Sequence, residues 1–348
     1  MKKTIAVLFG GCSPEHEVSL QSAFSVLQAI DASQYEVFPI GITKAGDWYH
    51  YLGAYESIPN GEWCNDSANL SPVVISQNRK DHGVIEIARD SRRIIQLNAA
   101  FPVLHGRNGE DGTVQGLFEL AGIPVVGCGT LASALCMDKE RAHRLVAQAG
   151  VHVPKSVVLT EKTRSIAAQT AEELSFPLFV KPLRAGSSFG ITKVNTCEEL
   201  VWAIDLAFSY DETVLLEEAI DGFEVGCAVL GTEQLLVGEP DEIELSGGFF
   251  DFTEKYTLKT STIHVPARID YETRSRVQDT ARTIYQALGC SGFARVDMFL
   301  RPSGEIVFNE VNTIPGFTSH SRYPNMMKAI GLSIEQVVAA IIELAVGI

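Results

Sequence analysis

The sequence predicts an α/β protein with a parallel N-terminal sheet, followed by units of the α+β class. Two observations carry this prediction. Apolar strand-like runs alternate with amphipathic helical patterns over the first 127 residues, which is typical of a parallel sheet with helical crossovers. Short strands then become frequent, and a length of 348 residues leaves room for two or three domains.

The elements follow one another without internal repeats or a low-complexity linker. In the first part we expect strands at 5–11, 35–43, 99–106 and 123–127, helices at 18–30 and 113–122, and turn-rich sequence with short strands from 44 to 93. We then expect a helix at 138–150, strands at 153–160, 176–183, 191–195 and 213–220, a helix at 198–210, a strand-rich segment from 224, and helices around 272–289 and 333–346. Residues 131–220 form a plausible smaller domain.

Composition and charge exclude several classes of protein. Apolar residues make up 46% and charged residues 20% of the chain, and no apolar run approaches the length of a membrane span, so we expect a cytoplasmic protein. A net charge of −15 argues against nucleic-acid and anionic-membrane partners. The seven cysteines include no CxxC pair and are expected to be reduced.

Polar residues interrupt an otherwise apolar hairpin, FARVDMFLRPSGEIVFNEVN, at 293–312. If the turn is centred between Ser303 and Gly304, Asp297 lies directly opposite Glu310. Period 2 places Arg295, Asp297 and Phe299 on one face of the first strand, and it places another set on one face of the second strand: Phe308, Glu310 and Asn312.

Two carboxylates and a carboxamide at one place are hard oxygen ligands that suit Mg²⁺. Two acids in register would otherwise repel each other, so a cation between them is favoured. The alternative is a solvated outer face of an edge hairpin, which the apolar neighbours on both faces disfavour.

Several loops could hold phosphates or an amino acid. LFVKPLRAGSSFGI places Lys181 on a strand before a Gly/Ser loop that could offer N–H groups and hydroxyls to phosphates, although it is not a Walker motif. Lys139 begins a helix and could be a second phosphate contact. An ordinary hairpin turn and a solvated lysine are the alternatives.

Five other segments carry candidate groups. LLEEAIDGFE resembles an adenine hinge, with the backbone at Glu218 and Ile220 reading the base and Glu224 accepting from the ribose; a surface turn is the alternative. Glu15, in FGGCSPEHEVSL, would repel a pyrophosphate and could hold an ammonium group, or it is a simple helix-start acid. His105 lies in a glycine-rich loop at the end of a strand, where open α/β sheets place ligands. Two further stretches supply the remaining candidates: Lys255, Tyr256, Gly316, Ser319, Ser321 and Arg322.

Taken in order, these motifs resemble the D-alanine–D-alanine ligases of the ATP-grasp superfamily. The resemblance runs from FGGCSPEHEVSL through HGRNGEDG, MDK, VKPLRAGSSFG, EKY and GFARVD to FNEVNTIPGFTSHS, which is nearly the whole chain. It implies three domains, at 1–130, 131–220 and 221–348, with ATP between the second and third. It also implies a reaction in which one D-alanine is phosphorylated by ATP and the amine of a second D-amino acid displaces the phosphate.

The resemblance also assigns roles to residues. It implies that Glu15 holds the first ammonium group and is linked to Ser187 and Tyr256, and that Arg295 and the N–H of Gly316 form an oxyanion site. Asp297, Glu310 and Asn312 would hold two Mg²⁺ ions, with Mn²⁺ as an alternative metal. Ser321 would hold the acceptor's carboxylate, beside His105 and Ser319. The implied nucleotide contacts are Lys139, Lys181, Ser188, Glu217, Glu218, Ile220, Glu224, Lys255 and Phe308.

Two positions depart from the pattern of ligases that use D-alanine twice. Arg322 replaces an apolar residue and Phe250 stands where a tyrosine is common, which resembles the D-alanine–D-serine ligases of glycopeptide-resistant bacteria. An arginine fork could hydrogen-bond a hydroxyl of the acceptor, so we expect D-serine to be preferred, with Arg322 and Asp241 contributing. The alternative is that Arg322 only braces the carboxylate clamp. The pair Lys255 and Tyr256 is retained, whereas the relatives that use D-lactate lack it. We therefore do not expect an ester product.

Other readings remain at this point. A D-alanine–D-alanine ligase, another carboxylate–amine ligase and a nucleotide-sensing module without catalysis all keep the same fold. The intact arginine, acids and asparagine of the hairpin disfavour the sensing module. The resemblance implies a homodimer, which no residue demonstrates by itself.

Overall fold

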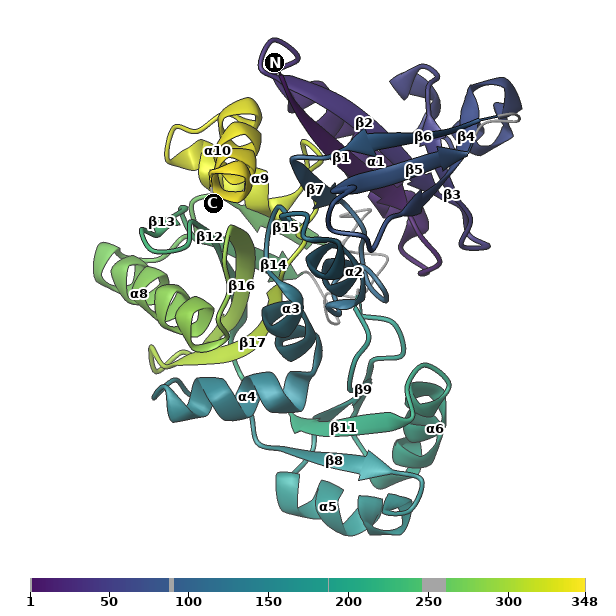
Figure 1. Cartoon of the computed structure of the whole chain (residues 1–348). Helices are drawn as coiled ribbons and strands as arrows, with labels where there is room; N and C mark the ends of the chain where they lie inside the picture. Colours follow the sequence, from purple (N-terminus) through teal and green to yellow (C-terminus); the bar gives the residue numbers. More distant parts are fainter. Residues whose placement is uncertain (1, 88–90, 187, 246–260, 348) are drawn as a thin grey trace.

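The computed structural model describes residues 2–87, 91–186, 188–245 and 261–347. They contain three β-sheets of seven, four and six strands, each with its own helices (Figure 1). The fold class is the mixed α/β and α+β class that the sequence predicts.

The N-terminal sheet has the strand order β6-β5-β4-β3-β2-β1-β7. Its strands are β1 (Lys3–Gly10), β2 (Tyr35–Ile42), β3 (Trp48–Tyr51), β4 (Leu70–Ile75), β5 (Gly83–Ile87), β6 (Arg92–Gln96) and β7 (Ala99–Pro102). Only β1 with β2 and β1 with β7 pair in parallel. The pairs of neighbouring strands from β2 to β6 are antiparallel. The strand expected at 123–127 makes a single bridge, between Val125 and Ala100.

Three helices belong to this first part of the chain: α1 (His16–Ala29), α2 (Thr113–Ala121) and α3 (Thr130–Met137). The inner face of α1 packs on the sheet, with Leu20, Ala23 and Leu27 in the core beside Ile5 and Val7. The sequence prediction missed α3, an eight-residue helix.

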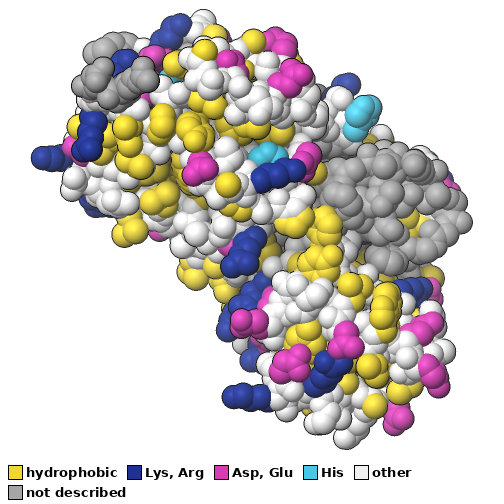
Figure 2. All heavy atoms as spheres, turned by 90° about the vertical axis from the view of Figure 1, so that its right-hand side faces the viewer, with side chains coloured by type: hydrophobic (Ala, Val, Ile, Leu, Met, Phe, Trp, Pro, Cys, Tyr) yellow, Lys and Arg dark blue, Asp and Glu magenta, His cyan; other side chains and the backbone are white. Residues whose placement is uncertain are grey.

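The second sheet forms a separate lobe at the bottom of Figure 1, with the order β10-β9-β11-β8. Its strands are β8 (Ser156–Thr160), β9 (Leu178–Pro182), β10 (Thr192–Val194) and β11 (Thr213–Glu218), and its helices are α5 (Ala167–Leu174) and α6 (Cys197–Phe208). A core of its own joins them, including Leu159, Val180 and Ile204. On the face shown in Figure 2, basic and acidic side chains are interspersed over this lobe.

The third sheet has the path β15-β14-β12-β16-β17, with β13 beside β12. Its strands are β12 (Phe223–Leu230), β13 (Leu236–Val237), β14 (Asp241–Leu245), β15 (Ser261–His264), β16 (Phe293–Leu300) and β17 (Ile306–Asn312). Its helices are α8 (Tyr271–Ala287), α9 (Arg322–Ala329) and α10 (Ile334–Val346). The helix α4 (Lys139–Gln148) lies against α8 and β17 rather than in the lobe (Figure 1). The domain boundaries at residues 130 and 220 stay predictions.

One face of the third sheet is apolar and is covered by α8. Val225 and Cys227 of β12, with Val296 and Met298 of β16, share a core with Ile284 of α8. Because side chains alternate along a strand, the residues between them, Gly226 and Asp297, point to the other face. That other face carries the site.

No single helix among the residues described here is long and apolar enough to cross a membrane. By length and composition alone the pair α9 and α10 would pass, but the two helices meet at 101°. The apolar residues of α10, including Val337, Ile341 and Ile342, are buried in the core with β1 and α1.

Candidate active site

Four residues lie side by side in a row across four neighbouring strands of the third sheet. Asp241 of β14 pairs with Gly226 of β12, Gly226 pairs with Asp297 of β16, and Asp297 pairs with Glu310 of β17. Residues directly opposite each other share a face of the sheet. The three carboxylates, and the position of Gly226, which has no side chain, therefore lie in line on the face away from α8.

The predicted pairing of Asp297 with Glu310 is confirmed, but the register changes immediately afterwards. Met298 pairs with Phe308, which leaves Asn309 as the extra residue of a β-bulge. The prediction that Phe308 shares the face of Glu310 is therefore wrong. Phe308 is fully buried in the core with Met298 and against the ring of His143, and it does not line the cavity described below.

Arg295 and Asp297 form a bidentate ion pair on β16. Nε and Nη2 of Arg295 donate to the Asp297 oxygens at 2.7 to 3.1 Å, and Asn312 Nδ2 donates to Oδ2 at 3.0 Å. Burial is the largest effect and acts to lower the pKa of Arg295, but the carboxylates of Asp297 and Asp241 together outweigh it and the pKa is raised. The guanidinium therefore stays charged in a site whose side chains are only 12% and 2% exposed.

Arg322 is the first residue of α9, and it lies among three carboxylates. Its Nε and Nη2 donate to Asp241 at 2.7 and 2.8 Å, and its Nη1 donates to Glu224 Oε1 at 2.5 Å. Nη2 also lies 3.4 Å from Asp297 Oδ1. Burial acts to lower the pKa of Arg322, but the surrounding acids outweigh it and raise the pKa well above its ordinary value.

Gly226 makes this arrangement possible. A Cβ atom at this position would lie 2.3 Å from Nη2 of Arg322 and 2.7 Å from Oδ1 of Asp241. The backbone N–H of Gly226 donates to the same Asp241 oxygen at 2.9 Å. The sequence reasoning missed Gly226, although a glycine inside a strand pattern signals close approach of another group.

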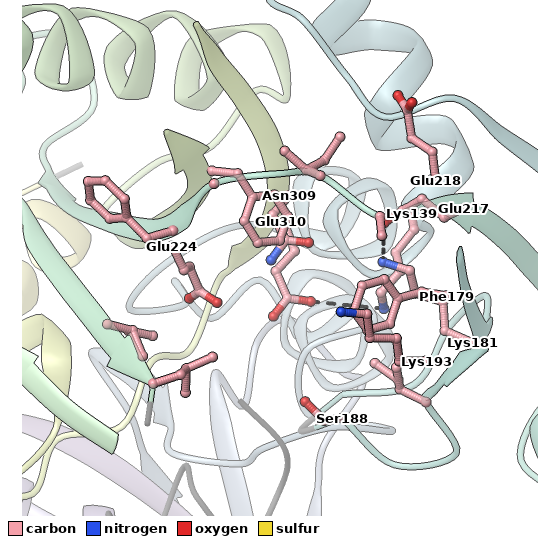
Figure 3. Close-up of a pocket in the computed structure, with 18 of the residues that line it drawn as sticks. Lys139, Phe179, Lys181, Ser188, Lys193, Glu217, Glu218, Glu224, Asn309 and Glu310 are labelled. Carbon is pink, nitrogen blue, oxygen red and sulfur yellow. Dashed lines mark hydrogen bonds and ion pairs between the residues drawn. The ribbon is translucent and has the colours of Figure 1, made fainter. Parts of the chain in front are cut away.

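A cavity of about 440 Å³ lies between the second and third sheets (Figure 3). Figure 3 shows Glu224 on one side of the cavity and Lys139, Lys181 and Lys193 on the opposite side. Glu310 lies between them. Seven of the predicted nucleotide contacts line the cavity: Lys139, Lys181, Ser188, Glu217, Glu218, Ile220 and Glu224. The prediction did not include Phe179, Lys193 and Phe299, which also line it. Phe299 could have been found, because it shares the face of Arg295 and Asp297.

Lys181 and Glu217 form a buried pair at one end of this cavity, at 2.5 Å. Glu217 Oε1 takes the lysine, while its Oε2 is buried without a hydrogen-bond partner among the described residues. A buried carboxylate oxygen without a partner is costly, so this atom fits a hydrogen-bond donor of a ligand. Lys139 Nζ donates to the backbone oxygen of Ala185 at 2.9 Å and lies 4.0 Å from Glu310.

The donor set at the hairpin fits a divalent cation that also takes oxygen from a ligand. Within the described ranges, no three His, Cys, Asp or Glu side chains come together as a metal cluster. Asp297, Glu310 and Asn312 offer two carboxylates and an amide oxygen, which is the partial set that Mg²⁺ completes with phosphate and water.

Glu15 lies between two glycine loops. A Cβ atom on Gly106 would lie 2.2 Å from Oε2 of Glu15, and one on Gly186 would lie 3.0 Å from it. The carboxylate of Glu15 therefore contacts the glycine-rich loop after β7 and the Gly/Ser loop after β9. Glu15 is buried, with 5% of its surface exposed.

His105 and Glu110 join the first sheet to the loop after β17. His105 Nε2 lies 3.1 Å from Ser22 Oγ, which also lies 3.4 Å from the N–H of Phe317. Burial lowers the pKa of His105 to about 4, so the ring is neutral. Glu110, which the prediction missed, accepts from the N–H of Gly106 at 2.8 Å and of Ile314 at 3.4 Å. Burial and the neighbouring carboxylate of Glu15 raise its pKa to about 8.

The loop before α9 brings Gly316 and Ser321 together. A Cβ atom on Gly316 would lie 2.7 Å from Ser321 Oγ, and the same Oγ accepts from the N–H of Thr318 at 3.0 Å. Ser319 and Arg322 line a second pocket, of about 720 Å³, whose lining residues all differ from those of the first cavity. The predicted residues Ser187, Phe250, Lys255 and Tyr256 lie outside the described residues.

Comparisons with known proteins agree with this geometry. Residues 4–128 match the family described as D-ala D-ala ligase N-terminus, and residues 145–343 match the family described as D-ala D-ala ligase C-terminus. The vancomycin/teicoplanin A-type resistance protein VanA of Enterococcus faecium is 46% identical over 98% of both chains. A D-alanine–D-alanine ligase of Caldicellulosiruptor bescii is 43% identical over 99% of this chain and 95% of its own.

A solved structure is more similar still. The crystal structure of the VanG D-Ala:D-Ser ligase from Enterococcus faecalis is 63% identical to this chain, covers 99% of it and 100% of its own chain, and superposes with a TM-score of 0.93.

Proposed function

From the premise that the chain belongs to the D-alanine–D-alanine ligase family, a family of ATP-dependent ligases that use a divalent metal, we propose that it joins D-alanine to D-serine. ATP is converted to ADP and phosphate, with D-alanyl phosphate as the intermediate. The product serves peptidoglycan precursor synthesis and glycopeptide resistance, which the similarity to the VanA and VanG proteins supports.

The observation that carries the choice of D-serine is the position of Arg322. Arg322 lines the pocket that Ser319 also lines, and the carboxylate of Asp241 accepts from Nε and Nη2 of its guanidinium. A guanidinium fixed in this way presents a directed donor that a hydroxyl oxygen can accept, whereas the methyl group of D-alanine cannot. A site built to bond a hydroxyl discriminates strongly against the analogue that lacks it.

The nucleotide occupies the cavity of about 440 Å³. Lys139 and Lys181 contact its phosphates with Ser188 and Lys255, and the backbone at Glu218 and Ile220 contacts adenine. Glu217 Oε2 accepts from the exocyclic amine of adenine, which supplies the partner that this buried atom lacks in the described structure. Glu224 accepts from the ribose hydroxyls.

Asp297, Glu310 and Asn312 would hold two Mg²⁺ ions, whose charge would neutralise the phosphates of the bound nucleotide. Arg295 stabilises the oxyanion that forms during acyl transfer, together with the N–H of Gly316. Glu15, supported by Ser187 and Tyr256, holds the ammonium group of the first D-alanine. Ser321 holds the acceptor's carboxylate beside Ser319, with His105 and Phe250 lining the amino-acid sites.

The roles divide over the three proposed domains. The first D-alanine binds to loops of residues 1–130, while residues 131–220 and 221–348 enclose the nucleotide. A homodimer completes the proposal. A D-alanine–D-alanine ligase is the second candidate, because the relative from C. bescii carries that name and is 43% identical.

Product analysis tests the proposal. The protein is incubated with ATP, Mg²⁺, D-alanine and D-serine in equal amounts, and the dipeptides are identified by mass spectrometry. We expect D-alanyl-D-serine as the main product and release of one phosphate for each dipeptide. D-alanyl-D-alanine as the main product would establish the second candidate instead. Binding of nucleotide without formation of any dipeptide would favour a sensing module.

A further inference from the structure

The ion pair of Arg322 with Glu224 links a residue of one pocket to a residue of the other. Arg322 lines the pocket of about 720 Å³ together with Ser319 and Asn325. Its Nη1 donates to Glu224, which lines the nucleotide cavity. The two side chains are only 6% and 16% exposed, so the contact is shielded from water and stronger than a surface ion pair.

The carboxylate of Glu224 can bind Arg322 and a ribose hydroxyl at the same time. A carboxylate has two oxygens, and Oε1 already accepts from Arg322. The carboxylate can therefore accept from a ribose hydroxyl while it keeps the arginine. A ribose bound in this way would restrict the carboxylate, and the carboxylate would in turn restrict the guanidinium.

The remaining contacts of Arg322 leave it little other freedom. Asp241 takes Nε and Nη2, and its Oδ1 is itself fixed by the N–H of Gly226. The space above Gly226 is just sufficient for the guanidinium, as the 2.3 Å distance from a notional Cβ to Nη2 shows. Of the three carboxylates around Arg322, Glu224 is the one that lines the nucleotide cavity.

Resting on the proposed function, we propose that the Arg322–Glu224 ion pair couples the two pockets. Occupation of the ribose position at Glu224 orients Arg322 for the acceptor, so nucleotide and acceptor each strengthen the binding of the other. Glu224 and Gly226 are positioning residues in this respect, since they act on the acceptor through Arg322. Coupling of this kind is reciprocal, and the effects are typically about 5-fold to 150-fold.

The test removes the ribose hydroxyls of the nucleotide and measures the effect on the KM for the acceptor. The KM for D-serine is measured with ATP and with 2′,3′-dideoxy-ATP, both at saturation. In the wild type we expect the KM for D-serine to rise about fivefold or more with the dideoxy nucleotide. In Glu224→Ala and in Gly226→Ala, where an added methyl group displaces the guanidinium but leaves every charge in place, the KM should be high with both nucleotides.

Glu244→Ala is the matched control. Glu244 also lines the nucleotide cavity, but its carboxylate pairs with His264 and Arg268. This variant should respond to loss of the ribose hydroxyls as the wild type does. An equal response in Glu224→Ala and the wild type would overturn the coupling.

Calorimetry tests the coupling without turnover, by measuring the affinity for ADP in the presence and absence of D-serine. D-serine should tighten ADP binding to the wild type about fivefold or more, and it should have no such effect on Glu224→Ala. Formation of D-alanyl-D-serine without this tightening, and with one KM for both nucleotides, would contradict the coupling while leaving the proposed function intact. Absence of any D-serine product would instead contradict the proposed function.

Discussion

Asp297 lies directly opposite Glu310 on neighbouring antiparallel strands, although the pairs that follow are out of step with this one. Beyond it, Met298 pairs with Phe308 and Leu300 with Ile306, so the single extra residue Asn309 brings the two acids into register. Bulges are used to re-aim side chains at functional sites in this way. The proposed metal site therefore depends on a local irregularity of β17.

Glu310→Gln should impair metal use more than folding. Glu310 lies directly opposite the like charge of Asp297 and 4.0 Å from Lys139, so loss of its charge also removes a repulsion and costs little stability. We expect the Mg²⁺ concentration for half-maximal rate to rise about tenfold or more, since a carboxylate ligand is replaced by an amide. Initial rates over a Mg²⁺ series and a thermal unfolding curve measure the two effects. A wild-type Mg²⁺ response would contradict the assignment.

Asp297→Asn should impair both activity and folding. The carboxylate is 2% exposed in its side chain and neutralises Arg295, with Arg322 3.4 Å away. Removal of one partner from a buried ion pair costs about 3 kcal/mol. Urea unfolding and turnover are measured together, and turnover at the wild-type rate would revive the reading of this protein as a sensing module.

Glu217→Gln should relax the choice of base. Its buried Oε2 has no partner in the described structure and is proposed to accept from the amine of adenine. Guanine presents a carbonyl oxygen there, which a carboxylate repels and an amide N–H can bond. We expect the ratio of the Kd values for GTP and ATP to fall about tenfold, in line with the ~1–3 kcal/mol cost of an unpaired buried group. Glu218→Gln, whose carboxylate accepts from the N–H of Lys155, is the control.

Glu110 should make stability depend on pH. Its folded pKa of about 8 lies above the ordinary value of 4.5, so the folded state binds more protons than the unfolded state between these values. The free energy of unfolding therefore falls as pH rises, by up to about 1.4 kcal/mol per unit, and the loss is complete above about pH 8.

Glu110→Gln should remove this slope. The free energy of unfolding is measured in urea at pH 5, 6, 7 and 8. At each step to higher pH, its value for the variant should increase relative to that of the wild type. Glu62→Gln, an exposed acid, should follow the wild type throughout. Parallel curves for Glu110→Gln and the wild type would show that Glu110 is ionised in the folded state. His105, with a folded pKa of about 4, acts in the opposite direction below pH 6.5, where its neutral folded form loses stability as pH falls.

Local patterns predicted much of the fold and the site. The turn centre assumed between Ser303 and Gly304 paired Asp297 with Glu310 correctly, although the hairpin reaches this pair only through the bulge at Asn309. The strand, loop and helix signals located Lys181 and Lys139 at the cavity. These features depend on residues close together in the sequence, so the sequence carries their signal.

Long-range contacts were less accessible. The three acids around Arg322 come from β12, β14 and β16, and only the assembled sheet shows that Gly226 leaves room for the guanidinium. The bulge at Asn309, which sends Phe308 into the core, has no local signature in this hairpin. The helix α9 is too short to show a clear period.

The selection of the acceptor is tested most directly by the ratio of kcat/KM for D-serine to kcat/KM for D-alanine, each as second substrate, at neutral pH. The account predicts a ratio well above one in the wild type. It predicts a fall of about tenfold or more in Arg322→Leu and a smaller fall in Arg322→Lys, which keeps the charge and loses the fork. A wild-type preference for D-alanine, or an unchanged ratio in a folded Arg322→Leu variant, would contradict it.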